Sequence, residues 1–147
     1  MDKWDRMYMR MAFIAASESH ARKRKVGAIA VKENNVIGIG INGTPSGWHS
    51  NKCEDLDNKT YPYVLHAETN MISKVAKSSI SSLGATCYTT TAPCLDCAKS
   101  IYQAGFSKVV YHTNYKNTEG IDFLRMMSVE VIEIDYEKIP DLKDQNP

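Results

Sequence analysis

Residues 85–113 read ATCYTTTAPCLDCAKSIYQAGFSKVVYHT, and this stretch decides the expected fold. Residues 85–91 are apolar and threonine-rich, as expected of a strand, and residues 108–113 form a second run of that kind. Between them, residues 94–105 have the pattern of a helix that ends at Gly105. A strand, a helix and a second strand at this spacing predict two parallel strands joined by a crossover helix.

The alternation of strands and helices continues on both sides of this stretch. Towards the C-terminus, a helix is expected around residues 120–128 and a strand over 129–135. Towards the N-terminus, residues 67–77 have a helical pattern, and two Ile/Val-rich runs at 26–32 and 35–42 predict a β-hairpin. The sequence therefore predicts an α/β sandwich whose later strands are parallel.

A helix is also expected over residues 4–19, where apolar side chains recur at intervals of three and four. We predict that these side chains form one stripe facing the core: Trp4, Met7, Tyr8, Met11, Ile14 and Ala15. Glycines inside the predicted hairpin indicate close packing or the approach of a ligand to the backbone.

Length and composition limit what this fold can belong to. The 147 residues predict one compact domain, residues 1–147, ending in a polar tail from about 136 to 147. Because no run is apolar enough for a membrane span or a signal peptide, we expect a cytoplasmic protein without membrane contact. A net charge of +1 argues against a nucleic-acid-binding protein and favours a small polar substrate.

His66, Cys94 and Cys97 are the candidate metal ligands. Zinc is bound tetrahedrally by nitrogen and sulfur, and a catalytic zinc keeps three protein ligands so that water can take the fourth position. The two cysteines are three residues apart in the first turn of the expected helix, so their sulfurs point the same way, and Pro93 suits the helix start. The helix N-terminus also favours the thiolate form. We therefore predict a zinc site between two helix N-termini.

Glu68 is the candidate catalytic residue, because a carboxylate beside a zinc-bound water can accept its proton and later donate it to a leaving group. Two residues of a regular helix would place His66 and Glu68 on opposite faces. The prediction therefore requires His66 to lie at the irregular start of its helix.

Two other interpretations of the cysteines are open. A C-x-x-C can be a redox pair, and a structural zinc needs a fourth ligand. The side chains available for that position are Cys53, Cys87, His49 and His112. A structural site would leave Glu68 without a role, and Cys87 in mid-strand is expected to be ordinary core.

The H-x-E and P-C-x-x-C pattern is the signature of zinc-dependent nucleobase deaminases. Over nearly its whole length the chain resembles the deoxycytidylate (dCMP) deaminases of the cytidine deaminase superfamily. The resemblance is carried by KVGAIAV (25–31), GIGINGTPSG (38–47), YPYVLHAETNMI (61–72), APCLDCAKSIYQAG (92–105) and YHTNY (111–115). It implies a three-layer sandwich with a five-stranded mixed sheet and helices on both faces, often as a homohexamer, and zinc-dependent hydrolysis of dCMP to dUMP and ammonia, a reaction that supplies dUMP for thymidylate synthesis.

The resemblance also assigns roles to individual residues. His66, Cys94 and Cys97 would hold zinc, and Glu68 would move protons between water, N3 of cytosine and the departing amine. Asn42 would hydrogen-bond the sugar and the backbone of Ala67 would contact the base, although an asparagine before a glycine is also a common turn residue.

The substrate phosphate needs cationic or hydroxyl partners. The basic run from Arg22 to Lys25 could supply them, although such a run is also typical of a solvated loop. Tyr115 and Lys116 follow the carboxyl end of a predicted strand, where open α/β sheets bind ligands, and Tyr115 matches an active-site tyrosine of the family.

Members of this family are commonly activated by dCTP and inhibited by dTTP, with Mg²⁺ on the triphosphate. A long polar loop is expected from Gly43 to about Tyr63. The corresponding second nucleotide site would lie at its start and involve Asn42, Gly43, Thr44, Ser46 and Gly47. Some relatives also carry a structural zinc near this region. Here His49 and Cys53 could be half of such a site, but they are more readily interpreted as surface loop residues.

Alternative functions come from two directions. The tRNA-adenosine deaminases and other nucleoside or nucleobase zinc deaminases share the metal-binding motifs, although the near-neutral charge and the N-G-T-P-S-G loop argue against a tRNA substrate. A non-catalytic, zinc-stabilised binding module would share the fold without turnover.

Overall fold

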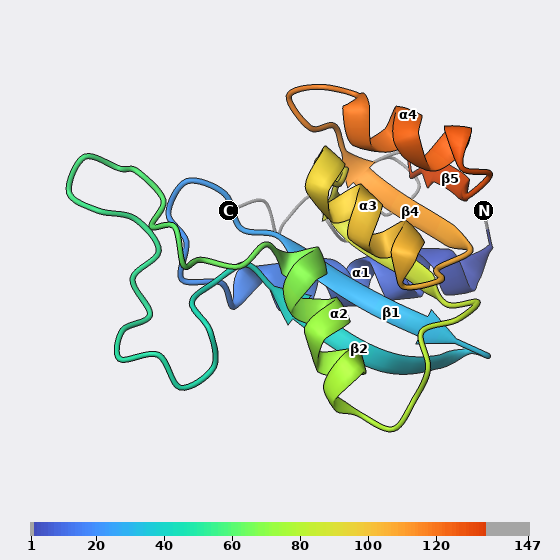
Figure 1. Ribbon diagram of the computed structural model, residues 1–147, viewed down its shortest axis with the longest axis horizontal. Helices are drawn as coiled ribbons and strands as arrows, with labels where there is room; N and C mark the ends of the chain where they lie inside the picture. The colour runs from blue at the N-terminus through green and yellow to red at the C-terminus, as the bar shows by residue number, and fades with distance from the viewer. Residues whose placement is uncertain (1, 135–147) are drawn as a thin grey trace.

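The computed structural model describes residues 2–134, which form a five-stranded mixed sheet (Figure 1). The strands are β1 (Gly27–Lys32), β2 (Asn35–Ile41), β3 (Thr86–Thr91), β4 (Lys108–Thr113) and β5 (Glu130–Glu133), in the order β2-β1-β3-β4-β5. Strand β1 is antiparallel to both of its neighbours, whereas β3, β4 and β5 are parallel. The predicted α/β fold with parallel later strands is confirmed.

The β1–β2 hairpin closes through a two-residue turn. Glu33 and Asn34 have φ angles of 50° and 62°, which is the left-handed geometry that matches the twist of a tight hairpin. The Tyr8 hydroxyl of the first helix donates to Asn34 Oδ1 at 2.7 Å. The predicted hairpin is therefore confirmed, and its turn is fastened to the helix beneath it.

Helices cover both faces of the sheet. Helix α1 (Lys3–Ser17) lies on one face, and α2 (Ala67–Lys77), α3 (Leu95–Gln103) and α4 (Glu119–Met126) lie on the other (Figure 1).

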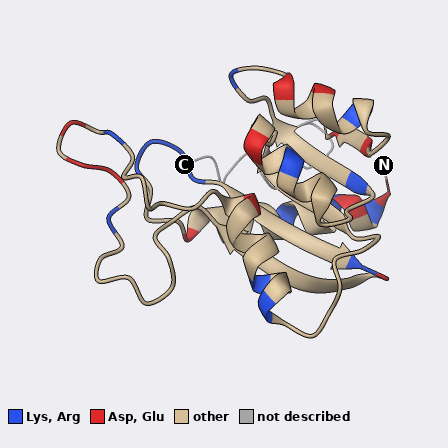
Figure 2. Ribbon diagram, in the orientation of Figure 1, with Lys and Arg blue, Asp and Glu red and all other residues tan. Residues whose placement is uncertain are grey.

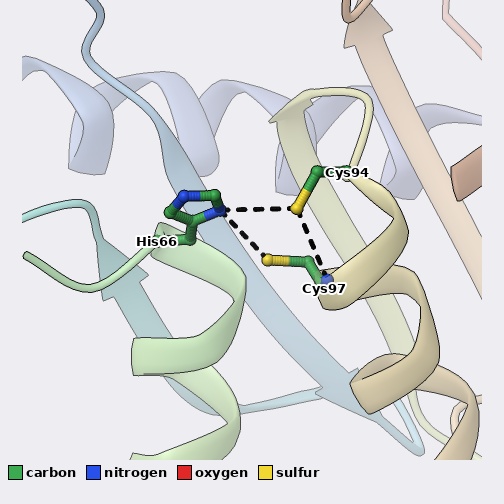
Figure 3. Close-up of side chains that lie close together, drawn as sticks. All are labelled: His66, Cys94 and Cys97. Atoms are coloured by element: carbon green, nitrogen blue, oxygen red, sulfur yellow. Dashed lines mark hydrogen bonds between the residues drawn. The ribbon is translucent and has the colours of Figure 1, made fainter. Parts of the chain in front are cut away.

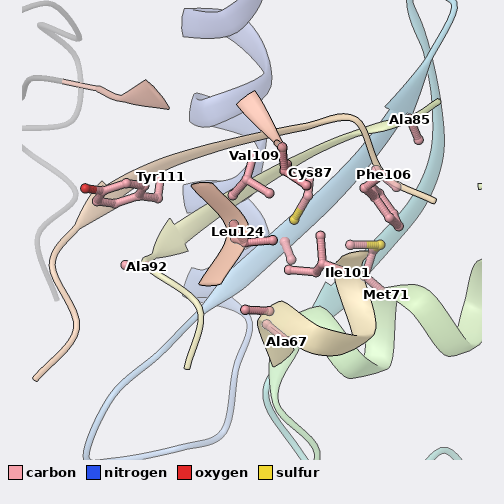
Figure 4. Packing of buried hydrophobic residues seen from close by; sticks show 14 of the residues in the cluster. Ala67, Met71, Ala85, Cys87, Ala92, Ile101, Phe106, Val109, Tyr111 and Leu124 are labelled. Atoms are coloured by element: carbon pink, nitrogen blue, oxygen red, sulfur yellow. The ribbon is translucent and has the colours of Figure 1, made fainter. Parts of the chain in front are cut away.

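Strand alternation divides the core into two clusters. In β1, Ala28 and Ala30 join the cluster under α2–α4, and Ile29 and Val31 join the cluster under α1. Figure 4 shows the larger cluster, in which side chains from β3, β4, α2 and α3 meet. Cys87 is fully buried there, as the sequence predicts, and burial raises the pKa of its thiol.

Two glycines allow helices to approach the sheet closely. A Cβ atom at Gly27 would collide with the Ala12 carbonyl oxygen of α1, and one at Gly40 would collide with the Ala67 carbonyl oxygen of α2. The hairpin glycines therefore serve close packing, and the Gly40 contact fixes the start of α2 against β2.

The predicted core stripe of α1 is wrong for Trp4, Met7 and Ile14, which are 41%, 37% and 56% exposed, and is confirmed for Tyr8, which is 4% exposed. Met11 and Ala15 are partly buried against the same cluster, and the buried face also carries Asp5, Met9, Ala12 and Ala16. Small residues at Ala12 and Ala16 let the helix lie directly on Gly27, and this contact selects the buried face.

Asp5 is the unexpected member of that buried face. Its Oδ1 accepts a hydrogen bond from the Tyr88 hydroxyl at 2.6 Å and lies 3.3 Å from Lys108 Nζ. Burial, followed by the hydrogen bond to Asp5, raises the pKa of the Tyr88 phenol. A carboxylate is tolerated here because Tyr88 of β3 and Lys108 of β4 supply partners from the sheet that faces α1.

Residues 42–66 contain no helix or strand and extend away from the sheet as a long loop (Figure 1). The loop is closed at its base by Gly43 and Leu65, whose amides and carbonyls exchange hydrogen bonds of 3.1 and 2.8 Å. The basic segment Arg22–Lys25 is seen as a blue run beside this loop in Figure 2.

Among the described helices, none combines the length and the apolar character needed to cross a bilayer. The predicted polar tail, about residues 136–147, lies outside the described residues, as does the last residue of the predicted strand 129–135.

Candidate active site

His66 is the N-cap residue of α2, with extended backbone angles of φ −70° and ψ 153°. Its carbonyl oxygen accepts the helical hydrogen bond from Asn70 N at 2.9 Å, so the helix begins directly after it. The side chain therefore leaves the chain before helical geometry starts. This placement allows His66 and Glu68 to line the same pocket despite their spacing of two.

Cys94 is the N-cap residue of α3, and its sulfur lies 3.5 Å from the Cys97 amide that donates to it. Pro93 immediately precedes this cap rather than opening the helix. Helix α4 supports the turn from outside, because a Cβ atom at Gly120 would collide with the Pro93 carbonyl oxygen. The two cysteines are thus held by the geometry of one helix start.

The three candidate ligands converge between the two helix starts (Figure 3). His66 Nδ1 lies 3.6 Å from Cys94 Sγ and 3.3 Å from Cys97 Sγ, and all three ligand atoms lie within 4.8 Å of one another. Tetrahedral zinc with its usual Zn–N and Zn–S bond lengths separates nitrogen and sulfur ligands by roughly 3.5 Å. The donor set and its spacing therefore fit zinc.

Glu68, the second residue of α2, lies beside this cluster and is only 4% exposed. Its Oε1 accepts a hydrogen bond of 2.7 Å from the Thr89 hydroxyl of β3. Glu68 lines the same pocket as His66 and Cys94, so the second carboxylate oxygen remains for chemistry in that pocket.

Electrostatics link the carboxylate to the cysteines. Burial raises the pKa of the Cys97 thiol, and the Glu68 charge raises it further, whereas the Thr69 hydroxyl, 3.6 Å from the sulfur, acts in the opposite direction. A bound metal ion would instead lower the pKa of the Cys97 thiol, because a coordinating thiol is deprotonated outright. The cluster is thus suited to a cation that compensates the negative charges gathered here.

A pocket of about 230 Å³ opens over the cluster. Three of the predicted substrate-binding residues line it: Asn42, Ala67 and Tyr115. The other three, Arg22, Lys25 and Lys116, are not part of its lining, and Lys116 Nζ instead lies 5.6 Å from the centre of the Tyr115 ring. From the basic run, it is Lys23 and Arg24 that reach the pocket.

Asn42 follows β2 and holds the basic segment through its side-chain amide. Its Oδ1 accepts from Val26 N at 2.9 Å, and its Nδ2 donates to the Arg24 carbonyl oxygen at 2.7 Å. It therefore fastens the basic segment to the end of β2 while lining the pocket. An amide group retains one further hydrogen and one lone pair for a ligand.

Glu54 is a functional candidate that sequence reasoning missed. It is 6% exposed, lines the pocket, and its carboxylate accepts hydrogen bonds from the backbone amides of Arg22 and Lys23. Its position in a polar loop gave no signal of burial, because its partners lie about thirty residues earlier. Glu54 therefore holds the backbone of the basic segment beside the pocket.

The residues predicted for the regulatory nucleotide site lie mostly outside the pocket lining. Of this set, Asn42 lines the pocket, whereas Gly43, Thr44, Ser46 and Gly47 do not.

The second, structural zinc site considered from the sequence has no matching cluster, because no group of three metal-binding side chains within residues 2–134 includes His49 or Cys53. His49 packs on Trp48 with ring centres 5.1 Å apart, and Cys53 is buried at the pocket wall, where burial raises the pKa of its thiol.

A three-layer α/β fold carrying a His-Cys-Cys cluster between two helix starts, with a buried glutamate beside it, defines the class of zinc-dependent deaminases. Comparison with known proteins makes this assignment narrower. A family model described as the cytidine and deoxycytidylate deaminase zinc-binding region matches residues 2–113. The chain therefore belongs to the cytidine and deoxycytidylate deaminase family.

Individual relatives agree with this assignment. The human protein named deoxycytidylate deaminase is 39% identical over 134 residues, covering 85% of this chain and 74% of the relative. The Saccharomyces cerevisiae deoxycytidylate deaminase is 34% identical and matches 93% of this chain, which spans only 46% of that longer relative. A crystal structure of the cyanophage S-TIM5 dCMP deaminase, in complex with dCMP and dUMP, is 45% identical, with a TM-score of 0.88 and coverage of 91% of this chain and 99% of the other.

Proposed function

We propose that this protein hydrolyses dCMP to dUMP and ammonia in a zinc-dependent reaction. The observation that carries the proposal is the placement of Glu68, buried beside the His66, Cys94 and Cys97 cluster and lining the pocket above it. The similarity to a cyanophage enzyme solved with dCMP and dUMP supports this choice of substrate.

The proton transfers fall to Glu68. Zinc held by His66, Cys94 and Cys97 would supply Lewis acidity and would lower the pKa of water in the pocket. Glu68 takes one proton from the attacking water and passes it to N3 of cytosine. It then carries the second proton of that water to the amino group, which leaves C4 as ammonia. Because Oε1 is occupied by Thr89, the transfers use the other carboxylate oxygen.

The pocket mouth supplies the nucleotide contacts. Lys23 and Arg24 line the pocket and offer positive charge for the 5′-phosphate, so we assign the phosphate to them in place of Arg22 and Lys25. Asn42 has hydrogen-bonding capacity left for the sugar, and Tyr115 offers an aromatic wall. The backbone of Ala67, at the start of α2, lines the pocket, and we assign it the contact to the base.

Regulation and assembly are a further part of the proposal and rest on the family resemblance. The protein would act as a homohexamer, activated by dCTP and inhibited by dTTP, each with Mg²⁺, through the loop that contains Asn42, Gly43, Thr44, Ser46 and Gly47.

The test measures the loss of cytosine absorbance when zinc-loaded protein meets dCMP, CMP, deoxycytidine or dCTP, and in parallel the formation of inosine in a tRNA anticodon stem-loop. We expect dCMP to be consumed fastest, and dCTP or dTTP with Mg²⁺ to shift the rate. Turnover of the RNA alone would assign the protein to the tRNA-adenosine deaminases. Full zinc occupancy without turnover of any substrate would leave a binding module.

The phosphate assignment has a matched pair of variants. Lys23→Ala combined with Arg24→Ala should raise KM for dCMP about 10-fold or more, since two charge-assisted contacts are lost. Arg22→Ala combined with Lys25→Ala removes the same charge from residues outside the pocket lining and should change KM far less. Equal effects of the two pairs would contradict the assignment and would indicate long-range electrostatic attraction only.

A further inference from the structure

Thr89 lies in the middle of β3 and carries a hydroxyl group in the centre of the sheet. It is fully buried, and its strand neighbours are Ala28 of β1 and Tyr111 of β4. A buried threonine in the centre of a sheet needs a partner for its hydroxyl, because an unpaired polar group there is costly. The acceptor of the Thr89 hydroxyl therefore indicates what this residue does.

The hydroxyl oxygen of Thr89 has two acceptors within reach. It lies 2.7 Å from Glu68 Oε1 and 2.9 Å from the Thr91 carbonyl oxygen. The hydroxyl has one hydrogen, so it can serve only one acceptor at a time, and a carboxylate is the stronger acceptor. The Thr91 carbonyl remains as an alternative that keeps the hydroxyl satisfied when it rotates.

The bond to Thr89 fixes the orientation of the Glu68 carboxylate. Glu68 comes from the first turn of α2 and has several rotatable bonds, whereas β3 lies in the centre of the sheet. A hydrogen bond from a rigid strand to one carboxylate oxygen therefore holds the other oxygen towards the pocket. Catalytic geometry is sensitive to such restraints, since a misplacement of about 1 Å can lower a rate roughly 100-fold.

We propose that Thr89 is a positioning residue that holds the Glu68 carboxylate in its productive orientation. The proposal rests on the proposed deaminase function, in which Glu68 moves the protons. Thr89 does not touch the substrate in this role, since it acts only through Glu68.

The variant that tests the proposal is Thr89→Val, which keeps the shape of the side chain and removes the donor. We expect kcat for dCMP to fall about 10-fold to 100-fold, while KM and zinc content stay close to those of the wild type. Thr89→Ser restores the hydroxyl and should recover most of kcat. Wild-type kcat in Thr89→Val, or failure of Thr89→Ser to recover activity, would overturn the proposal.

Thr90→Val is the matched control for the loss of a buried hydroxyl from the same strand. Thr90 is 2% exposed, and its Oγ1 accepts from Gly27 N at 3.1 Å instead of contacting Glu68. This variant should lose stability without the specific loss of kcat. A comparable loss of kcat in both variants would show that only strand stability is at stake and would overturn the proposal.

Crystal structures of the zinc-loaded wild type, Thr89→Val and Thr89→Ser separate this proposal from the proposed function. In Thr89→Val the Glu68 carboxylate should rotate or occupy two positions, whereas in Thr89→Ser it should keep the wild-type position. If the wild type fails to convert dCMP, the proposed function falls, and the structures still decide the role of Thr89. An unmoved Glu68 in Thr89→Val would overturn the positioning role whatever the substrate.

Discussion

Two carboxylates are buried on opposite sides of β3, and their surroundings differ in an instructive way. Asp5 of α1 accepts a hydrogen bond from the Tyr88 hydroxyl at 2.6 Å, and Glu68 of α2 accepts one from the Thr89 hydroxyl at 2.7 Å. Both residues are 4% exposed. Two consecutive residues of one strand thus donate to two acidic side chains in the two layers.

The difference lies in how each charge is compensated. Asp5 has Lys108 Nζ at 3.3 Å, so its charge is neutralised within the core. The ion pairs described within residues 2–134 do not include Glu68, which instead lines a pocket beside three metal-binding side chains. A buried carboxylate whose counter-charge is built in contributes to structure, whereas one whose counter-charge must come from a bound ion is available for chemistry.

The largest expected effect comes from Glu68→Gln, which removes the charge and keeps the shape. Activity on dCMP should fall by roughly 10²–10⁴-fold, because general acid–base catalysis typically contributes that much. Zinc content should remain at one per chain, and the melting temperature of the metal-free protein should not fall, since a buried charge without an internal counter-charge has been removed. Retained activity would exclude Glu68 as the proton carrier and would remove the contrast between a catalytic Glu68 and a structural Asp5.

Removal of the metal tests whether a bound ion compensates the charge of Glu68. Chelation should lower the melting temperature by about 10 °C, the size expected for loss of a ligand held well above its Kd. Hydrogen exchange should then accelerate in residues 66–70 and 94–98 more than in α1. Uniform acceleration across α1 would show that the two carboxylate regions are not independent.

Asp5→Asn tests the structural side of the comparison. Loss of the charge leaves Lys108 without its partner in a mostly buried setting, so the free energy of unfolding should fall by about 2–3 kcal/mol. Urea denaturation measures this value, and kcat per folded molecule should stay near that of the wild type. A loss of kcat equal to that of Glu68→Gln would contradict the division of roles.

Tyr88→Phe should have the smallest effect. It removes one hydrogen bond to Asp5 and keeps the ring packed on Tyr8, whose centre is 5.2 Å away. The expected cost is about 1–2 kcal/mol of stability with unchanged kcat. The unchanged kcat would contrast with Thr89→Val, in which kcat is expected to fall.

Local chemistry explains why much of the fold and the metal cluster could be predicted from the sequence. The hairpin follows from two Ile/Val-rich runs that flank Glu33 and Asn34, and the parallel strands follow from the strand-helix-strand pattern around Cys94 and Cys97. The requirement that His66 lie at a helix start came from its spacing to Glu68, and the structure places it at the N-cap.

Contacts between distant parts of the chain explain what could not be predicted. The buried face of α1 depends on Gly27, and the burial of Asp5 depends on Tyr88 and Lys108, which lie 83 and 103 residues away. Periodicity alone selected Trp4, Met7 and Ile14 because it counts apolar side chains and ignores close approach of backbones. Likewise, Glu54 holds the backbone of Arg22 and Lys23 from 32 and 31 residues further along the sequence, a contact that no local pattern predicts.

The paired hydrogen bonds between Gly43 and Leu65 have a consequence for how this family can change over time. They bring the two ends of the long loop together immediately before His66, so the segment between them can lengthen or shorten without moving the metal ligands. Leu56, at the fully exposed part of the loop, is therefore a natural place to insert a reporter peptide. Insertions confined to this exposed tip would leave the pocket-lining part of the loop, including Cys53, Glu54 and Thr60, in place beside the metal ligands.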